Sequence, residues 1–268
     1  MKTILLLAAG ALAFAQTQKT FDTPEAAAED LIQAAASGNT AELQAIFGAN
    51  AHTVLTSGNS AQDKAEREEF SVTAKMKHQL LHDSMDRDRM ILSIGDEDWP
   101  FPVPIVRRNG AWMFDTAMGE RSMKARRIGA NEIDAIAICE SLTEAQIRFA
   151  ETNPQHSYAP NLAALAAYVP KDFVGDEGGA APRPYRGYLF KILRSQGPNA
   201  AGGAYPYLVK KELLGGFAIV AWPAQYGVTG INTFIVNHDG IVYEKDLGPH
   251  TGPPVTSFNP DATWRSVN

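Results

Sequence analysis

The chain has 268 residues, of which 45% are hydrophobic and 20% charged, with a formal net charge of −6 and one cysteine, Cys139. An acidic protein repels phosphate backbones and anionic lipid surfaces, which argues against nucleic-acid and membrane-surface partners. A single cysteine cannot form an intramolecular disulfide, so a hydrophobic core must stabilise the fold, and a chain of this length can bury one.

The first 15 residues have the pattern of a secretory signal peptide. Lys2 precedes an apolar run over residues 4–14, and Ala13-Phe14-Ala15 has the small-x-small pattern of a cleavage site. The apolar run is too short to cross a bilayer comfortably. We therefore expect cleavage near Ala15 and a soluble periplasmic or secreted protein, with no stable membrane insertion.

Residues 19–118 are predicted to form a first α+β unit. Thr23 and Pro24 are typical of a helix start, and Gly38 of its end. Asn109-Gly110 is a strong hairpin signal. The pattern predicts helices over residues 24–37, 40–47 and 60 to about 82, and strands over 90–94, 103–108 and 111–116. This order of helices and an antiparallel hairpin resembles a small NTF2-like cone.

Residues 119–268 are predicted to form a second α+β unit. A basic helix over 119–127 is followed by a longer helix that Asn131 caps and that ends near Thr152 before Pro154. Its apolar stripe consists of Ile138, Leu142, Ala145 and Phe149.

An antiparallel meander of about four strands follows this helix, with β-formers concentrated between turn residues. The strands are predicted over residues 188–193, 217–222, 231–236 and 241–245, and Asp239-Gly240 marks the last hairpin. A long helix packed on such a meander resembles the globular domain of type IV pilins and pseudopilins. Those proteins keep an apolar assembly helix, which this sequence lacks directly before Asn131.

The mature chain as a whole carries a more specific resemblance. Segments such as FDTPEAAAEDLIQAA, DWPFPVPIVRRNGAWMFDT and GGFAIVAWPAQYGVTGINTFIVNHDGIVYEKDLG, within residues 21–264, resemble the bacterial exported family known as domain-of-unknown-function family 2950. The resemblance implies an exported bacterial protein of this architecture. It implies no activity and no catalytic residues.

No group of residues has the spacing of a catalytic, metal or cofactor site, so we predict none. His78 and His82 lie four apart on a predicted helix, but a zinc site needs at least three protein ligands. The adjacent pair His238-Asp239 is more typical of a hairpin tip than of a hydrolase triad. Cys139 lies beside the apolar stripe and is interpreted as a buried structural thiol.

Aromatic residues beside prolines at predicted strand ends are the candidate binding residues: Trp99, Phe101, Trp222 and Tyr226. Exposed aromatic side chains frequently anchor partners. The leading hypothesis is therefore a non-enzymatic periplasmic protein that binds a protein or glycan of the cell envelope.

Two alternatives stay open at this point. The first is an enzyme or small-ligand carrier that uses a pocket in the NTF2-like half, with His52, His78, Asp98 and Asp115 as candidate polar groups. The second is a calcium-stabilised scaffold, which would use the acidic clusters at residues 96–98 and at Asp172, Asp176 and Glu177.

Overall fold

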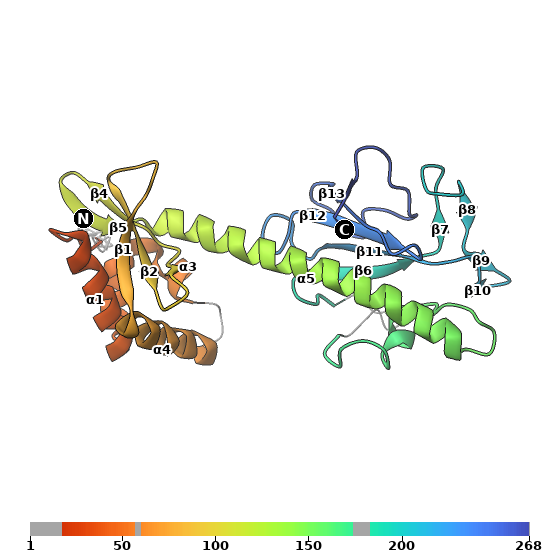
Figure 1. Cartoon of the computed structure of the whole chain (residues 1–268), viewed down its shortest axis with the longest axis horizontal. Coiled ribbons are helices and arrows are strands. Elements are labelled where there is room, and N and C mark those ends of the chain that lie inside the picture. The colour runs from red at the N-terminus through yellow and green to blue at the C-terminus, as the bar shows by residue number, and fades with distance from the viewer. Residues whose placement is uncertain (1–17, 57–59, 174–182, 268) are drawn as a thin grey trace, which may run out of the picture. The chain divides into compact units, whose positions relative to one another are not determined.

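The computed structural model describes residues 18–56, 60–173 and 183–267. The predicted signal peptide, residues 1–15, lies outside the described residues. Contacts divide the chain into unit 1, Met1–Met123, and unit 2, Lys124–Asn268. The fold is a mixture of helices and antiparallel sheets, which confirms the predicted α+β class (Figure 1).

Unit 1 combines short helices with a five-stranded sheet of order β1-β2-β4-β5, in which β3 also pairs with β2. Its elements are α1 (Pro24–Ser37), α2 (Thr40–Phe47), η1 (Gly48–Asn50), α3 (Ala51–Leu55), α4 (Ser60–Met76), β1 (His78–His82), β2 (Arg89–Ile94), β3 (Trp99–Pro100), β4 (Ile105–Arg108) and β5 (Ala111–Phe114). Leu31 and Phe47 of the helices pack with Leu92, Ile105 and Phe114 of the sheet. These fully or nearly fully buried side chains form the core of unit 1.

Helix α4, which was predicted to run from residue 60 to about 82, is shorter than predicted. It ends at Met76, and the residues expected to complete it form β1, which pairs antiparallel with β2 from His78↔Ile94 to His82↔Met90. Leu80 and Leu81 fit either a helix or a strand pattern locally. Pairing with β2 decides in favour of the strand, because it satisfies backbone groups and lets Leu80 pack on the core.

Unit 2 is built on a five-stranded antiparallel sheet of order β14-β13-β12-β11-β6, here called sheet C. Its strands are β6 (Tyr188–Leu193), β11 (Ala218–Pro223), β12 (Asn232–Asn237), β13 (Val242–Asp246) and β14 (Arg265–Ser266). The other elements are η2 (Leu162–Leu165), the pair β7 (Ser195–Gln196) and β8 (Tyr205–Pro206), and the pair β9 (Leu208–Val209) and β10 (Glu212–Leu213). The four longer strands of sheet C follow one another as the predicted meander.

The two helices predicted over residues 119–152 are one continuous helix, α5 (Thr116–Thr152). Asp115 caps it, since its Oδ1 accepts the Met118 N–H at 2.9 Å. Gly129 lowers helix propensity by only about 1 kcal/mol and does not interrupt the helix. Asn131, the predicted cap, lies inside the helix. Although α5 has 37 residues, neither it nor any other described helix has an apolar stretch that could cross a membrane.

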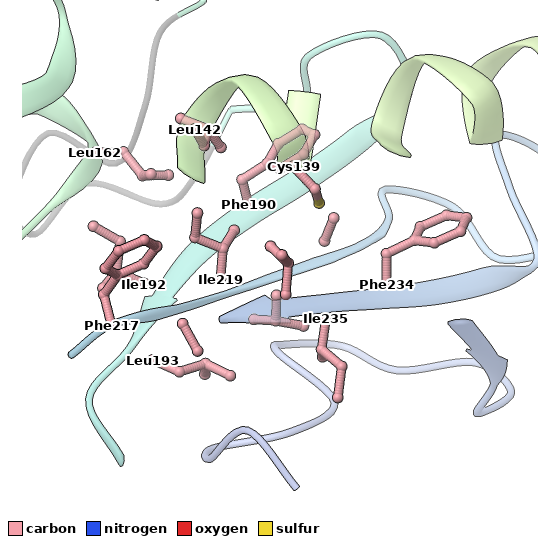
Figure 2. Packing of buried hydrophobic residues seen from close by; sticks show 14 of the residues in the cluster. Cys139, Leu142, Leu162, Phe190, Ile192, Leu193, Phe217, Ile219, Phe234 and Ile235 are labelled. Carbon is pink, nitrogen blue, oxygen red and sulfur yellow. The ribbon is translucent and has the colours of Figure 1, made fainter. Parts of the chain in front are cut away.

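One stripe of α5 covers sheet C. Ala135, Cys139, Leu142 and Ala145 are buried against sheet residues that include Phe190, Ile192, Ile219 and Phe234. Figure 2 shows Cys139 and Leu142 on the helix above one face of the sheet, whereas Leu193 and Ile235 lie on the opposite side. The predicted stripe is confirmed in its centre; Ile138 and Phe149 lie at its partly buried edges.

Replacing Leu142 by Ala should destabilise unit 2 by about 2–5 kcal/mol, because a fully buried Leu leaves a cavity between helix and sheet. The matched control is Ile147→Ala on the same helix, where the side chain is 42% exposed. Urea denaturation followed by circular dichroism measures both free energies of unfolding. Equal losses would contradict the described packing.

Candidate functional site

The two aromatic candidates of unit 1 differ in exposure. Phe101 packs against Phe70 and Phe114, with ring centroids 5.2 and 6.5 Å apart, and belongs to the edge of the core. Trp99 in β3 is 45% exposed. Of this pair, Trp99 is the more exposed, with slightly less than half of its surface in contact with solvent.

The two candidates of unit 2 differ in the same way. Trp222, predicted to lie at a strand end, is an interior residue of β11, pairs with Leu189 of β6 and is 3% exposed. The strand continues one residue further to Pro223, which brings Trp222 into the sheet. Trp222 therefore cannot anchor a partner in this conformation. Tyr226, in the turn that follows β11, is 38% exposed.

This turn, residues 224–231 between β11 and β12, is here called the β11–β12 turn. The Gly227 N–H donates to the Gly230 carbonyl at 2.8 Å, and Thr229 Oγ1 accepts the Gln225 N–H at 3.1 Å. A Cβ atom on Gly230 would lie 2.1 Å from Tyr188 Oη. The backbone is thus fixed by internal hydrogen bonds and by a close approach that only glycine permits.

Helix α5 supports the turn with two polar side chains. Asn131 Nδ2 donates to the Thr229 carbonyl at 2.8 Å, and Glu132 Oε1 accepts the N–H groups of Ile231 and Asn232, each at 2.9 Å. Hydrogen bonds to a charged acceptor are among the stronger ones. The sequence did not reveal this role, since Asn131 was interpreted as a helix cap and Glu132 was not singled out.

Tyr188 of β6 also supports the start of β12, next to the β11–β12 turn. Its hydroxyl donates to the Asn232 carbonyl at 3.0 Å and lies 3.5 Å from Glu132 Oε1. Burial, followed by the charge of Glu132, raises the pKa of Tyr188 well above its ordinary value. The phenol therefore stays neutral and keeps its proton for this hydrogen bond.

Apolar side chains cover the outside of the turn. Tyr226, Val228 and Ile231 are each 37–38% exposed and are here called the turn surface. The Tyr226 hydroxyl donates to Asp246 Oδ2 at 3.1 Å, and this hydrogen bond is the main cause of the raised pKa of Tyr226. The ring is therefore held in one orientation while much of it stays in contact with water.

The polar groups named for a pocket in unit 1 do not form one group. They are His52, His78, Asp98 and Asp115. His78 Nε2 lies 3.2 Å from Glu29, Asp98 accepts a hydrogen bond from Lys77 at 2.8 Å, and Asp115 caps α5. Among the described residues, none of the four bonds to another of the set. A cavity of about 300 Å³ lies instead in unit 2, lined by Ile235 and by residues between Pro254 and Trp264.

The candidate metal ligands are likewise separated. His78 and His82 lie on a strand, where a four-residue spacing corresponds to about 13 Å. The part of the chain that the structure describes contains no group of three or more His, Cys, Asp or Glu residues that could hold a metal ion. Asp172 accepts a hydrogen bond from Tyr185 at 3.3 Å, and Asp176 and Glu177 lie outside the described residues.

Cys139 is 0% exposed, and burial raises the pKa of its thiol far above the ordinary value. The thiolate, which is the nucleophilic form, is therefore strongly disfavoured. This placement agrees with a structural thiol in the helix–sheet core.

Comparison with known proteins identifies one family. A family model described as "Protein of unknown function (DUF2950)" matches residues 18–172 and 165–267. A search of curated proteins and a search of solved structures find no match.

Replacing Glu132 by Ala should lower the free energy of unfolding by about 1–3 kcal/mol, because the substitution leaves two turn N–H groups without their charged acceptor. Glu140→Ala is the matched control, since Glu140 is an exposed acid on the same helix. Chemical denaturation of both variants checks this. A loss no larger than that of the control would show that the carboxylate does not support the turn.

Proposed function

The chain belongs to the DUF2950 family of proteins of unknown function, and on that premise we propose a non-enzymatic binding role in the cell envelope. In this proposal the protein is exported, is soluble after signal cleavage, and binds an envelope protein through the turn surface of unit 2. The observation that carries it is a rigid turn that displays Tyr226, Val228 and Ile231.

Rigidity favours binding because a partner then has little conformational entropy to remove. The turn is held by its own hydrogen bonds, by Asn131 and Glu132 of α5, and by the fixed Tyr226 ring. Binding residues are frequently found on loops that a rigid scaffold positions. Tyrosine is also enriched among the residues that dominate protein–protein binding energies.

The environments of the reactive side chains support a role without catalysis. Several acids are engaged in structural contacts: Asp83 and Asp86 form ion pairs with Arg89, and Asp98 forms one with Lys77. The pKa of the Cys139 thiol is shifted away from reactivity. These contacts stabilise turns and strand ends.

The proposal extends to architecture. Residues 19–118 are proposed to form an NTF2-like cone and residues 119–268 a pilin-like domain. In support, unit 1 packs helices on an antiparallel sheet, and unit 2 packs one helix on an antiparallel meander. A binding role suits a pilin-like domain that lacks the apolar assembly helix.

Site-specific photo-crosslinking tests the turn surface. A photoreactive phenylalanine analogue at Val228 should yield a discrete crosslinked protein when the full chain is irradiated in envelopes of producing bacterial cells. The control position is Met85 of unit 1, which is 91% exposed and should yield no such product. The same product from both positions, or none from Val228, would contradict the proposal.

Substitution of the turn surface gives a second test. Tyr226→Ala combined with Val228→Ser should reduce the yield of a crosslink placed at Ile231 by at least fivefold, because the partner loses its apolar contacts. Trp99→Ala, which removes an exposed aromatic ring from unit 1, should leave the yield unchanged. If the two variants behave alike, the turn surface is not the binding site.

A further inference from the structure

The segment after β13 covers the face of sheet C that α5 leaves uncovered. Side chains alternate along β12, so Phe234 faces α5 and Ile235 faces this segment (Figure 2). The segment is anchored at Phe258, whose N–H donates to Ser195 at 3.0 Å and whose carbonyl accepts from Gly197 at 2.8 Å. Further along, β14 pairs with β13.

The cavity of about 300 Å³ lies between this C-terminal segment and sheet C. It is lined by Ile235, Pro254, Val255, Thr256, Ser257, Asn259 and Trp264. This volume is at the lower end of the range of about 300–1,000 Å³ that is usual for small-molecule sites. It suits a ligand of one ring with its substituents.

The lining residues themselves carry no charged side chain, and Lys245 Nζ lies 5.9 Å from the centroid of the Trp264 ring. A ligand in the cavity thus finds no charged lining group to pair with, and burying an unpaired charge is costly. Accessible apolar surface comes from the Trp264 indole and from the Pro254-Val255 pair, while Ile235, which is 0% exposed, forms the buried floor. An aromatic ring beside aliphatic groups can accept the carbon–hydrogen face of a sugar ring, which is flat and weakly polar.

Polar groups in the lining retain hydrogen-bond donors and acceptors that a ligand could use. Asn259 Oδ1 accepts the Asn199 N–H at 2.8 Å, so Nδ2 retains both of its N–H donors. Within the described residues, the hydroxyls of Thr256 and Ser257 make no hydrogen bond. An uncharged set of donors and acceptors beside an indole matches a neutral, hydroxyl-bearing ligand.

We propose that this cavity is a binding site for a neutral acetamido sugar. The pyranose ring would lie on Trp264, the acetamido methyl would contact Val255, and Asn259 with the two hydroxyls would bond the polar substituents. The apolar lining favours the acetamido derivative over the plain hexose, which has no methyl group to bury. This site is separate from the turn surface, and either can fail without the other.

Titration of the purified full-length mature protein with N-acetylglucosamine tests the site. Two-dimensional amide NMR should show saturable shifts at Ile235 and within residues 254–264, with glucose binding at least threefold more weakly. No saturable shift, or shifts confined to other parts of the chain, would overturn the proposal.

Two variants locate the contact. Trp264→Ala should weaken N-acetylglucosamine binding at least tenfold, whereas Trp99→Ala, the matched tryptophan of unit 1, should bind as the wild type does. Thr256→Val removes one hydroxyl from an exposed residue and should weaken binding at least threefold. Thermal melting shows whether Trp264→Ala is folded. If it is not, the affinity of Thr256→Val for N-acetylglucosamine tests the site. Wild-type affinity in every folded variant would overturn the site.

Discussion

Close packing of α5 on sheet C is the contact on which the rest of unit 2 depends. Ala135, Cys139, Leu142 and Ala145 present mostly small side chains at helical spacing, so the helix can lie directly on the sheet. Glu132 lies one turn before Ala135 on the same helix and reaches the β11–β12 turn. A slip of the helix by one residue would move this carboxylate by about 1.5 Å, enough to break its hydrogen bonds.

Sheet C serves two purposes because successive side chains of a strand point to opposite faces. Phe234 belongs to the core beneath α5, while its neighbour Ile235 forms part of the cavity under the C-terminal segment. One strand thus joins a rigid core to a site that can hold a ligand. At the other end of the same strand, the backbone of Asn232 is held by Glu132.

Sequence predicts the parts of this fold whose residues repeat with a regular period. The meander and the α5 stripe were predictable because apolar residues recur at strand and helix spacing. The stretch from His78 to His82 was not, since only pairing with β2 makes it a strand. Trp222 was placed at a strand end because a following proline resembles a breaker, yet Pro223 is accommodated as the last residue of β11, where it pairs with Tyr188 of β6 and lies beyond the pairing with β12. The cavity has no periodic signal at all, because Ile235 and Trp264 meet only through the path of an irregular segment.

Burial of Cys139 has a consequence for the chemistry of the chain under oxidising conditions. It is the one cysteine in the sequence, it lies between helix and sheet, and its pKa is raised. In an oxidising compartment a folded molecule therefore offers no thiolate for coupling to another thiol. Only a chain that has lost the helix–sheet contact exposes the sulfur. A disulfide-linked dimer of this protein would therefore form only from molecules in which unit 2 had at least partly unfolded.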